Sequence, residues 1–143
     1  MDGVGVQARA AARAEELPGA ELVHPFGPEF DVTKVCGKVF MLMSARNDAP
    51  IVTLKAAPAD ANVLREAYPE IVPGYHMNKK HWITISGGGS LEPELLDDLV
   101  TESYLLVVET LPKRLQPVNP ATFGRRSEAG GRDGEGAAAP QLG

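Results

Sequence analysis

The sequence is poor in the residues that support covalent or metal-centred chemistry. Cys36 is the single cysteine among 143 residues, so an internal disulfide and a zinc site built on several thiolates are both excluded. Nowhere does the chain approach the run of about 18 apolar residues that a membrane-spanning helix needs. The start of the chain also lacks the basic-then-apolar pattern of a secretory signal. We therefore expect a cytoplasmic protein that makes no use of a membrane.

What is present is the composition of an ordinary globular domain, with 43% hydrophobic and 23% charged residues. The net charge of −5 argues against a surface covered in basic residues for tight nucleic-acid binding. The charges are unevenly distributed, however. Residues 32–90 contain seven basic and four acidic residues, whereas residues 91–115 contain two basic and six acidic residues. A folded domain could thus present one positive and one negative face.

Hydrophobic periodicity predicts a single α+β domain over residues 1–115. An alanine- and arginine-rich helix is expected at 4–16, only weakly anchored because alanine side chains bury little area. The remaining pattern predicts sequential strands, then a helix, a strand and a longer helix, with helices packed on one face of a mostly antiparallel sheet. The predicted strands cover 21–26, 32–44 with a turn or bulge at Gly37, 51–55 and 82–86, and the two later helices begin at Pro58 and Pro93.

The end of the chain changes character at Gln116. From there the sequence consists mainly of glycine, proline, alanine and isolated charges, with almost no apolar anchor after Ser127. Such a composition cannot form a packed core, so we expect residues 116–143 to be a disordered tail.

The segment 74–82 is the densest in groups suited to recognition, with two histidines, two lysines, an asparagine, a tyrosine and the only tryptophan. Lys79 and Lys80 could contact phosphates, and Asn78 could bind a phosphate or a base edge. Tyr75 or Trp82 could stack on an exposed base. Lysines at positions 34, 38 and 55 would extend the positive surface.

A purely structural explanation of the same segment competes with this one. Trp82 and Met77 would belong to the core, Asn78 would close a turn through its side chain, and His76 or His81 would cap a backbone group. The lysines would then be solvated surface residues. For Trp82 the core position is favoured, because a lone tryptophan at the start of a strand usually anchors a core.

Other chemistries find weaker support in the residues. A metal site would need His76, His81 and a third ligand such as His24 or Cys36, and the five-residue separation does not place two histidines together on a helix. Ser103 and Tyr104 fall on a helix stripe, where packing and hydrogen bonding explain them. The triple glycine at 87–89 lacks the lysine and hydroxyl of a phosphate loop and suggests a flexible turn. A buried strand position is the ordinary expectation for Cys36.

A series of motifs carries a resemblance to a known family. The motifs are Leu17-Pro18-Gly19-Ala20, Pro25-Phe26-Gly27, Lys34-Val35-x-Gly37-Lys38-x-Phe40, Thr53-Leu54-Lys55, Leu64-Arg65-x-x-Tyr68-Pro69, the run from Val72 to Trp82, Ser103-Tyr104 and Leu111-Pro112-Lys113. In this order and spacing they resemble the MmcQ/YjbR family. The resemblance implies a CyaY-like, or double-wing, α+β domain, and DNA binding by analogy with double-wing transcription factors. The helix at 4–16 lacks the apolar residues expected at that position in the family, and the glycine-rich tail lies outside the family pattern.

The combined expectation is a non-catalytic nucleic-acid-binding module without metal or cofactor, with double-stranded DNA as its partner. The residues expected to bind are Lys34, Lys38, Lys55, Tyr75, His76, Asn78, Lys79, Lys80, His81 and Trp82. Two alternatives remain open. One is an adaptor domain that docks an unidentified protein, and the other is a small-ligand binder or enzyme around His76, Asn78 and His81.

Overall fold

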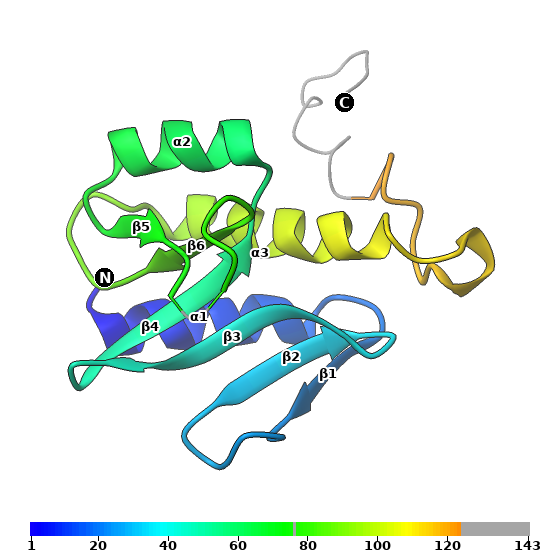
Figure 1. Cartoon of the computed structure of the whole chain (residues 1–143), viewed down its shortest axis with the longest axis horizontal. Coiled ribbons are helices and arrows are strands. Elements are labelled where there is room, and N and C mark those ends of the chain that lie inside the picture. Colours follow the sequence, from blue (N-terminus) through cyan, green and yellow to red (C-terminus); the bar gives the residue numbers. More distant parts are fainter. Residues whose placement is uncertain (76, 124–143) are drawn as a thin grey trace. The chain divides into compact units, whose positions relative to one another are not determined.

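Six strands form one antiparallel sheet in the order β1-β2-β3-β4-β6-β5 (Figure 1). The computed structural model describes residues 1–75 and 77–123. Its strands are β1 (Ala20–Val23), β2 (Asp31–Val35), β3 (Lys38–Arg46), β4 (Ala49–Lys55), β5 (Ile71–Pro73) and β6 (Trp82–Ile85). Together with three helices they confirm the predicted α+β class and its antiparallel sheet, with the first four strands forming the expected meander.

Tight turns close the two central hairpins. Cys36 and Gly37 between β2 and β3 have φ values of 49° and 80°, and Asn47 and Asp48 between β3 and β4 have 52° and 66°. Positive φ at both central residues is the signature of a two-residue turn whose twist matches the sheet. The turn at Gly37 is therefore confirmed, but Cys36 is exposed in this turn, and the expected buried strand position is wrong. The second loop is also shorter than expected, since Pro50 already belongs to β4.

The three helices are α1 (Gly3–Glu15), α2 (Pro58–Ala67) and α3 (Pro93–Val108). Asp2 caps α1 by accepting the Gly5 amide at 2.7 Å, and Pro58 opens α2 as predicted. Among residues 1–75 and 77–123, no helix combines the length and the apolar character needed to cross a bilayer.

Small side chains and polar contacts hold α1 in place. Val6, Ala10 and Ala14 are at most 3% exposed, and the Gln7 amide donates to the carbonyls of Ser44 and Ile51. Arg9 forms a two-pronged ion pair with Asp97 of α3, at 2.8 and 2.7 Å. These hydrogen bonds and the ion pair add to the small apolar area on which the expectation of weak anchoring was based.

The sheet has two faces with different cover. Strand alternation and register place one set of side chains on the side of α1, which we call the helix face: Thr33, Val35, Met41, Met43, Val52, Leu54, Ile83 and Ile85. A cavity of about 70 Å³ between Ala11 and Ala14 of α1 and Met41 and Met43 of β3 identifies this side. The opposite side, here the loop face, carries Val32, Lys34, Leu42, Ser44, Thr53, Lys55 and Thr84.

The chain divides into two compact units, Met1–Val107 and a second one that begins at Val108. The second unit contains the short 3-10 helix η1 (Lys113–Leu115), followed by bends and turns up to Phe123. Of the tail predicted at 116–143, residues 124–143 lie outside the described residues.

Candidate nucleic-acid interface

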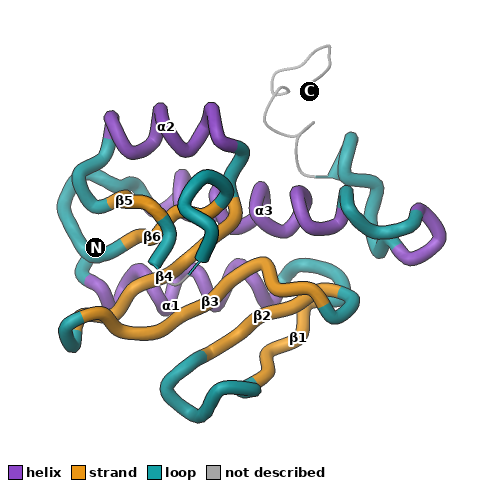
Figure 2. Tube along the Cα trace, in the orientation of Figure 1, coloured by secondary structure: helices purple, strands orange, loops and turns teal. Residues whose placement is uncertain are grey.

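The loop between β5 and β6 folds over the loop face at β4 and β6 (Figure 2). Its two ends are tied by a hydrogen bond of 2.8 Å from the Gly74 amide to the Trp82 carbonyl. A Cβ at position 74 would lie 2.6 Å from the Trp82 Cβ, closer than real carbon atoms approach. Gly74 is therefore required for the close approach of the loop ends.

A pair of buried threonines fixes the first turn of the loop. The Tyr75 amide donates to Thr84 Oγ1 at 2.7 Å, and this oxygen lies 2.9 Å from Thr53 Oγ1 on the neighbouring strand. Thr53 and Thr84 are 0% and 1% exposed, so water does not replace these contacts, and Thr84 Oγ1 serves as partner to both the Tyr75 amide and the Thr53 hydroxyl. The sequence around Thr53 predicts a strand at 51–55 but gives no sign of this contact.

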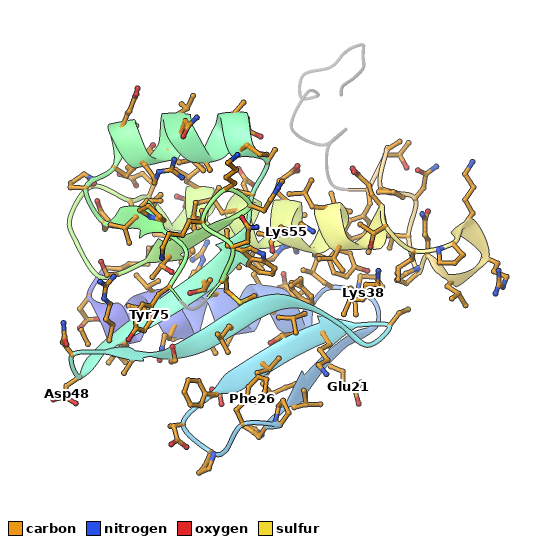
Figure 3. All side chains as sticks on the ribbon, in the orientation of Figure 1. Glu21, Phe26, Lys38, Asp48, Lys55 and Tyr75 are labelled. Carbon is orange, nitrogen blue, oxygen red and sulfur yellow. The ribbon has the colours of Figure 1, made fainter. Side chains whose placement is uncertain are left out.

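Arg46, at the end of β3, is the residue of this surface that the sequence analysis missed. Its guanidinium carbon lies 4.7 Å from the centre of the Tyr75 ring, within the range of a cation–π contact. Figure 3 places Tyr75 near the hairpin that carries Asp48. One face of the ring is occupied by Arg46, which removes that face from the stacking expected of Tyr75. The sequence did contain one signal for this position. Arg46 follows Ser44 by two residues in a strand, so both side chains belong to the loop face.

The polar middle of the loop is a turn closed by Asn78. Its side-chain oxygen accepts the Lys80 amide at 2.9 Å, and its carbonyl accepts the His81 amide at 3.2 Å. The structural explanation for Asn78 is thus confirmed, and its side-chain oxygen is already engaged. Lys79, Lys80 and His81 are exposed, and Lys79 Nζ lies 3.3 Å from the Gly74 carbonyl. His76 lies outside the described residues.

The sheet lysines do not all share one face. Lys34 pairs with Val39 and follows Val32 by two residues, which places it on the loop face with Lys55. The two lysines lie two strands apart, or about 10 Å at the usual strand spacing. Lys38 instead pairs with Val35, which is 0% exposed, so its position in the register belongs to the helix face. In Figure 3, Lys38 lies at the end of the sheet away from Tyr75.

Trp82 and Met77 are both half-buried rather than part of the fully buried core. Trp82 lies directly opposite Lys55 in the sheet, at the end of the loop that contains the lysine pair. The favoured position of Trp82 as a core anchor is therefore wrong in degree, because part of its side chain remains accessible.

Ser103 and Tyr104, considered for catalysis, have hydrogen-bonding roles in the fold. Among the residues that the structure describes, no group of three or more histidine, cysteine, aspartate or glutamate side chains could hold a metal ion. The Ser103 hydroxyl donates to the Phe40 carbonyl and accepts the Lys55 amide. Tyr104 donates to the Pro18 carbonyl, and burial raises its pKa to about 12. Packing and hydrogen bonding, as predicted, explain both residues.

The first two glycines of the triplet at 87–89 are closely packed against other parts of the chain, and the expected flexible turn is not found there. A Cβ on Gly87 would meet the Gly3 nitrogen at 2.5 Å, and one on Gly88 would meet a carboxylate oxygen of Glu70 at 2.6 Å. Gly89, by contrast, has open space around it. The first two glycines are thus needed for packing, and no phosphate-binding role is required to explain them.

Comparison with known proteins places this arrangement in a family. The YjbR family model matches residues 15–106, which include the whole sheet and the loop between β5 and β6. The chain belongs to the YjbR family. It is 47% identical over 116 residues to the uncharacterised protein YbdF of Escherichia coli O157:H7, covering 81% of this chain and 95% of YbdF. It is 35% identical over 80 residues to the uncharacterised YjbR of Escherichia coli K12, covering 56% of this chain and 68% of that one.

Solved structures show the same YjbR architecture. The crystal structure of protein DR2400 from Deinococcus radiodurans, with a DUF419 domain, matches with a TM-score of 0.70 and 34% identity over 79% of this chain and 88% of that chain. The crystal structure of a Pseudomonas syringae protein matches with a TM-score of 0.58 and 27% identity over 70% of this chain and 95% of its own. The MmcQ/YjbR resemblance inferred from the motifs is thereby confirmed.

Proposed function

We propose that this YjbR-family protein binds the phosphate backbone of double-stranded DNA through its loop face, without catalysis and with little base specificity. The observation that supports the proposal is the Arg46–Tyr75 contact, which brings a third strand residue to a face that already carries Lys34 and Lys55. The loop adds the exposed Lys79 and Lys80.

The chemistry of these groups suits phosphate better than base edges. An arginine stacked on an aromatic ring keeps its N–H groups in a fixed plane, which favours two-pronged contact with phosphate. Asn78 has its side-chain oxygen engaged in the turn and Tyr75 has one ring face covered, so both are less suited to reading bases. Backbone contact without base readout produces affinity that depends strongly on salt.

The acidic charge of the chain does not fall evenly on this surface. The acidic segment 91–115 lies on α3 and beyond it, and α1 is joined to α3 through Arg9 and Asp97 on the helix side of the sheet. On the loop face, Glu21 lies opposite Lys34 in the register and offsets part of its charge. We therefore expect Lys79, Lys80 and Arg46 to contribute more to binding than Lys34.

Fluorescence anisotropy of a labelled random duplex, titrated at low and at near-physiological salt, tests the proposal. Replacing Lys79 and Lys80 by alanine together should weaken binding and reduce the slope of log affinity against log salt by about 2. The matched control is the double variant Lys113→Ala, Arg114→Ala, which removes the same charge from exposed positions of the second unit. Equal losses in both variants would indicate general attraction to charge and would contradict a site on the loop face.

Absence of binding at low salt would reject the proposal, since electrostatic affinity is greatest there. The adaptor function would then become the first hypothesis. It would be tested by recovery of one stoichiometric protein partner that nuclease treatment does not remove.

A further inference from the structure

Strand β1 forms an outer edge of the sheet, where its backbone can pair with another chain (Figure 1). Val35 and Lys38 flank the two-residue turn between β2 and β3, and such flanking residues bond to each other. Because the direction of backbone groups alternates along a strand, Thr33 points its N–H and C=O toward β3 as Val35 does. Their partners in β1, Ala20 and Leu22, therefore point these groups away from β2.

The contacts at this edge agree with that geometry. The Ala20 amide donates to the Leu17 carbonyl at 3.1 Å, which directs it away from β2. The Leu22 side chain is 57% exposed, although leucine is ordinarily buried. A strand edge with outward N–H and C=O groups accepts an extended chain as a further strand. Pro18 and Pro25 lie on either side of β1 and carry no N–H donor, so an added strand would be short.

The cavity of about 70 Å³ beneath α1 reaches this same edge. Its apolar wall comes from Ala11 and Ala14 of α1, Leu22 of β1 and Met41 and Met43 of β3. The register agrees with this position, because Leu22 lies opposite Thr33, a residue of the helix face. At about 30 Å³ for each water-sized group, the cavity holds about two or three non-hydrogen atoms, the size of a valine isopropyl group.

Acidic side chains border the edge on both faces of the sheet. Glu15 is exposed and lines the cavity on the helix face. Glu21 is exposed and precedes Leu22 in the strand, so its side chain belongs to the loop face, where Lys34 lies opposite and offsets part of its charge. A segment added to β1 would therefore meet carboxylates beside its apolar contact, which favours lysine or arginine next to an aliphatic residue.

We propose that the β1 edge binds an extended peptide segment as an added antiparallel strand, with a valine-sized side chain flanked by lysine or arginine. The aliphatic residue lies opposite Leu22, exchanges two main-chain hydrogen bonds with it and places its side chain in the cavity. The residues on either side of it point to the loop face, where one lies opposite Glu21. A second copy of this chain suits the edge less well, because two acidic edges would face each other.

The test is a titration of the full ¹⁵N-labelled chain with the capped peptide acetyl-Thr-Lys-Val-Lys-Thr-amide, followed by amide chemical shifts and hydrogen exchange. We expect saturable shifts at residues 20–23. With the peptide at about ten times its dissociation constant, exchange of the Leu22 amide should slow about tenfold, because only about a tenth of the chain stays free. The Glu21 amide, which points toward β2, should change much less.

The control peptide carries an N-methyl group on the central valine. This change removes the N–H that would donate to Leu22 and keeps the charge and the side chains, so binding should be lost. Undiminished binding of the methylated peptide, or shifts spread over other parts of the chain, would overturn the proposal.

The role of the cavity is tested by changing its occupant and its volume. Replacing the central valine of the peptide by alanine should weaken binding about tenfold, because two carbon groups leave the cavity. Ala11→Leu fills the cavity from α1 with a residue that also favours a helix, so this variant should bind the valine and alanine peptides almost equally. Thermal unfolding checks that the variant is folded. A full preference for valine in folded Ala11→Leu would contradict the assigned pocket.

Two charge-matched variants test the acidic border. Glu21→Gln removes one carboxylate from the edge and should weaken peptide binding about twofold to fivefold. Glu66→Gln removes the same charge from an exposed position of α2 and should leave binding unchanged. Equal affinities of wild type and Glu21→Gln would contradict the requirement for a basic residue.

A second copy of the chain as the occupant is distinguished by the protein alone. If exchange of the Leu22 amide slowed as the protein concentration rose without peptide, the edge would pair with another copy, and the peptide proposal would be overturned. Slower exchange only in the presence of the peptide supports the proposal. None of these outcomes depends on DNA binding.

Discussion

The guanidinium carbon of Arg46 lies 4.7 Å from the centre of the Tyr75 ring, joining the end of β3 to the second residue of the loop that follows β5. The two residues are far apart in the sequence. Such a contact contributes about 0.5–1 kcal/mol at an exposed site. Its larger consequence is geometric, because it holds the Arg46 guanidinium beside the loop that carries Lys79 and Lys80.

Arg46→Ala should lower the affinity for a random DNA duplex by about threefold to tenfold at low salt, because one phosphate contact and its preorganisation are lost. Arg46→Lys keeps the charge but loses the planar stacking, and should lie between wild type and the alanine variant. Fluorescence anisotropy measures both. The matched control is Lys38→Ala, whose register position belongs to the other face of the sheet. If Lys38→Ala lost as much affinity for the duplex as Arg46→Ala, binding would not depend on which face of the sheet carries the charge.

There is a physical reason why the sequence predicts only part of this surface. The motif from Val72 to Trp82 identified the loop, and the strand pattern identified Lys34 and Lys55, because both signals are local in the chain. The contact of Arg46 with Tyr75 joins segments brought together only by folding, so no local pattern contains it.

The separation of Lys34 from Lys38 shows a related limit. Both lysines are four residues apart in a segment with strand character, and a simple alternation would place them on the same face. The two-residue turn at Cys36 and Gly37 changes that relation, because it pairs Lys38 with Val35 and so places Lys38 on the face opposite Lys34. Side-chain direction in a hairpin depends on the turn and the bulge, which the periodicity of the segment does not determine.

Thr84→Val should destabilise the protein by about 1–3 kcal/mol and also weaken duplex binding. The change is nearly isosteric, but it leaves the Tyr75 amide and the Thr53 hydroxyl without the acceptor or partner that Thr84 Oγ1 provides. Urea denaturation measures the stability, and the anisotropy titration measures binding. Thr33→Val, at a buried threonine of the helix face, is the control for binding. If Thr84→Val lost stability but bound duplex normally, the loop would not need this anchor for recognition.

Gly74→Ala should destabilise the fold by about 1–3 kcal/mol, because the added Cβ would lie 2.6 Å from the Trp82 Cβ and the two loop ends would have to separate. Gly89→Ala is the matched control, since a Cβ there meets nothing within 4 Å, and its effect should stay within about 0.5 kcal/mol. Thermal unfolding of the three proteins makes the comparison. Equal melting temperatures for wild type and Gly74→Ala would mean that the loop ends separate without cost.

Glu70→Gln should destabilise the protein and flatten its stability profile at acid pH. The Glu70 carboxylate is 5% exposed and accepts hydrogen bonds from the Ser90 hydroxyl and from the amides of Ser90 and Leu91, at 2.9 and 3.1 Å for the two amides. These bonds, the Ser90 hydroxyl first, lower the pKa of Glu70 below its ordinary value of 4.5, against the opposing effect of burial.

The direction of the pH dependence follows from that lowered pKa. Because the folded state holds the proton less tightly than the unfolded state, the contribution of Glu70 is fully present above pH 4.5 and is lost as the pH falls through the lower, folded-state pKa. Glutamine cannot ionise, so the free energy of unfolding of Glu70→Gln should change less over this acid range than that of wild type. Urea denaturation between pH 3 and pH 7, about the range over which carboxylates titrate, measures both curves. Parallel curves for the two proteins would show that ionisation of Glu70, whose carboxylate binds the segment after β6, does not contribute to the pH dependence of the free energy of unfolding.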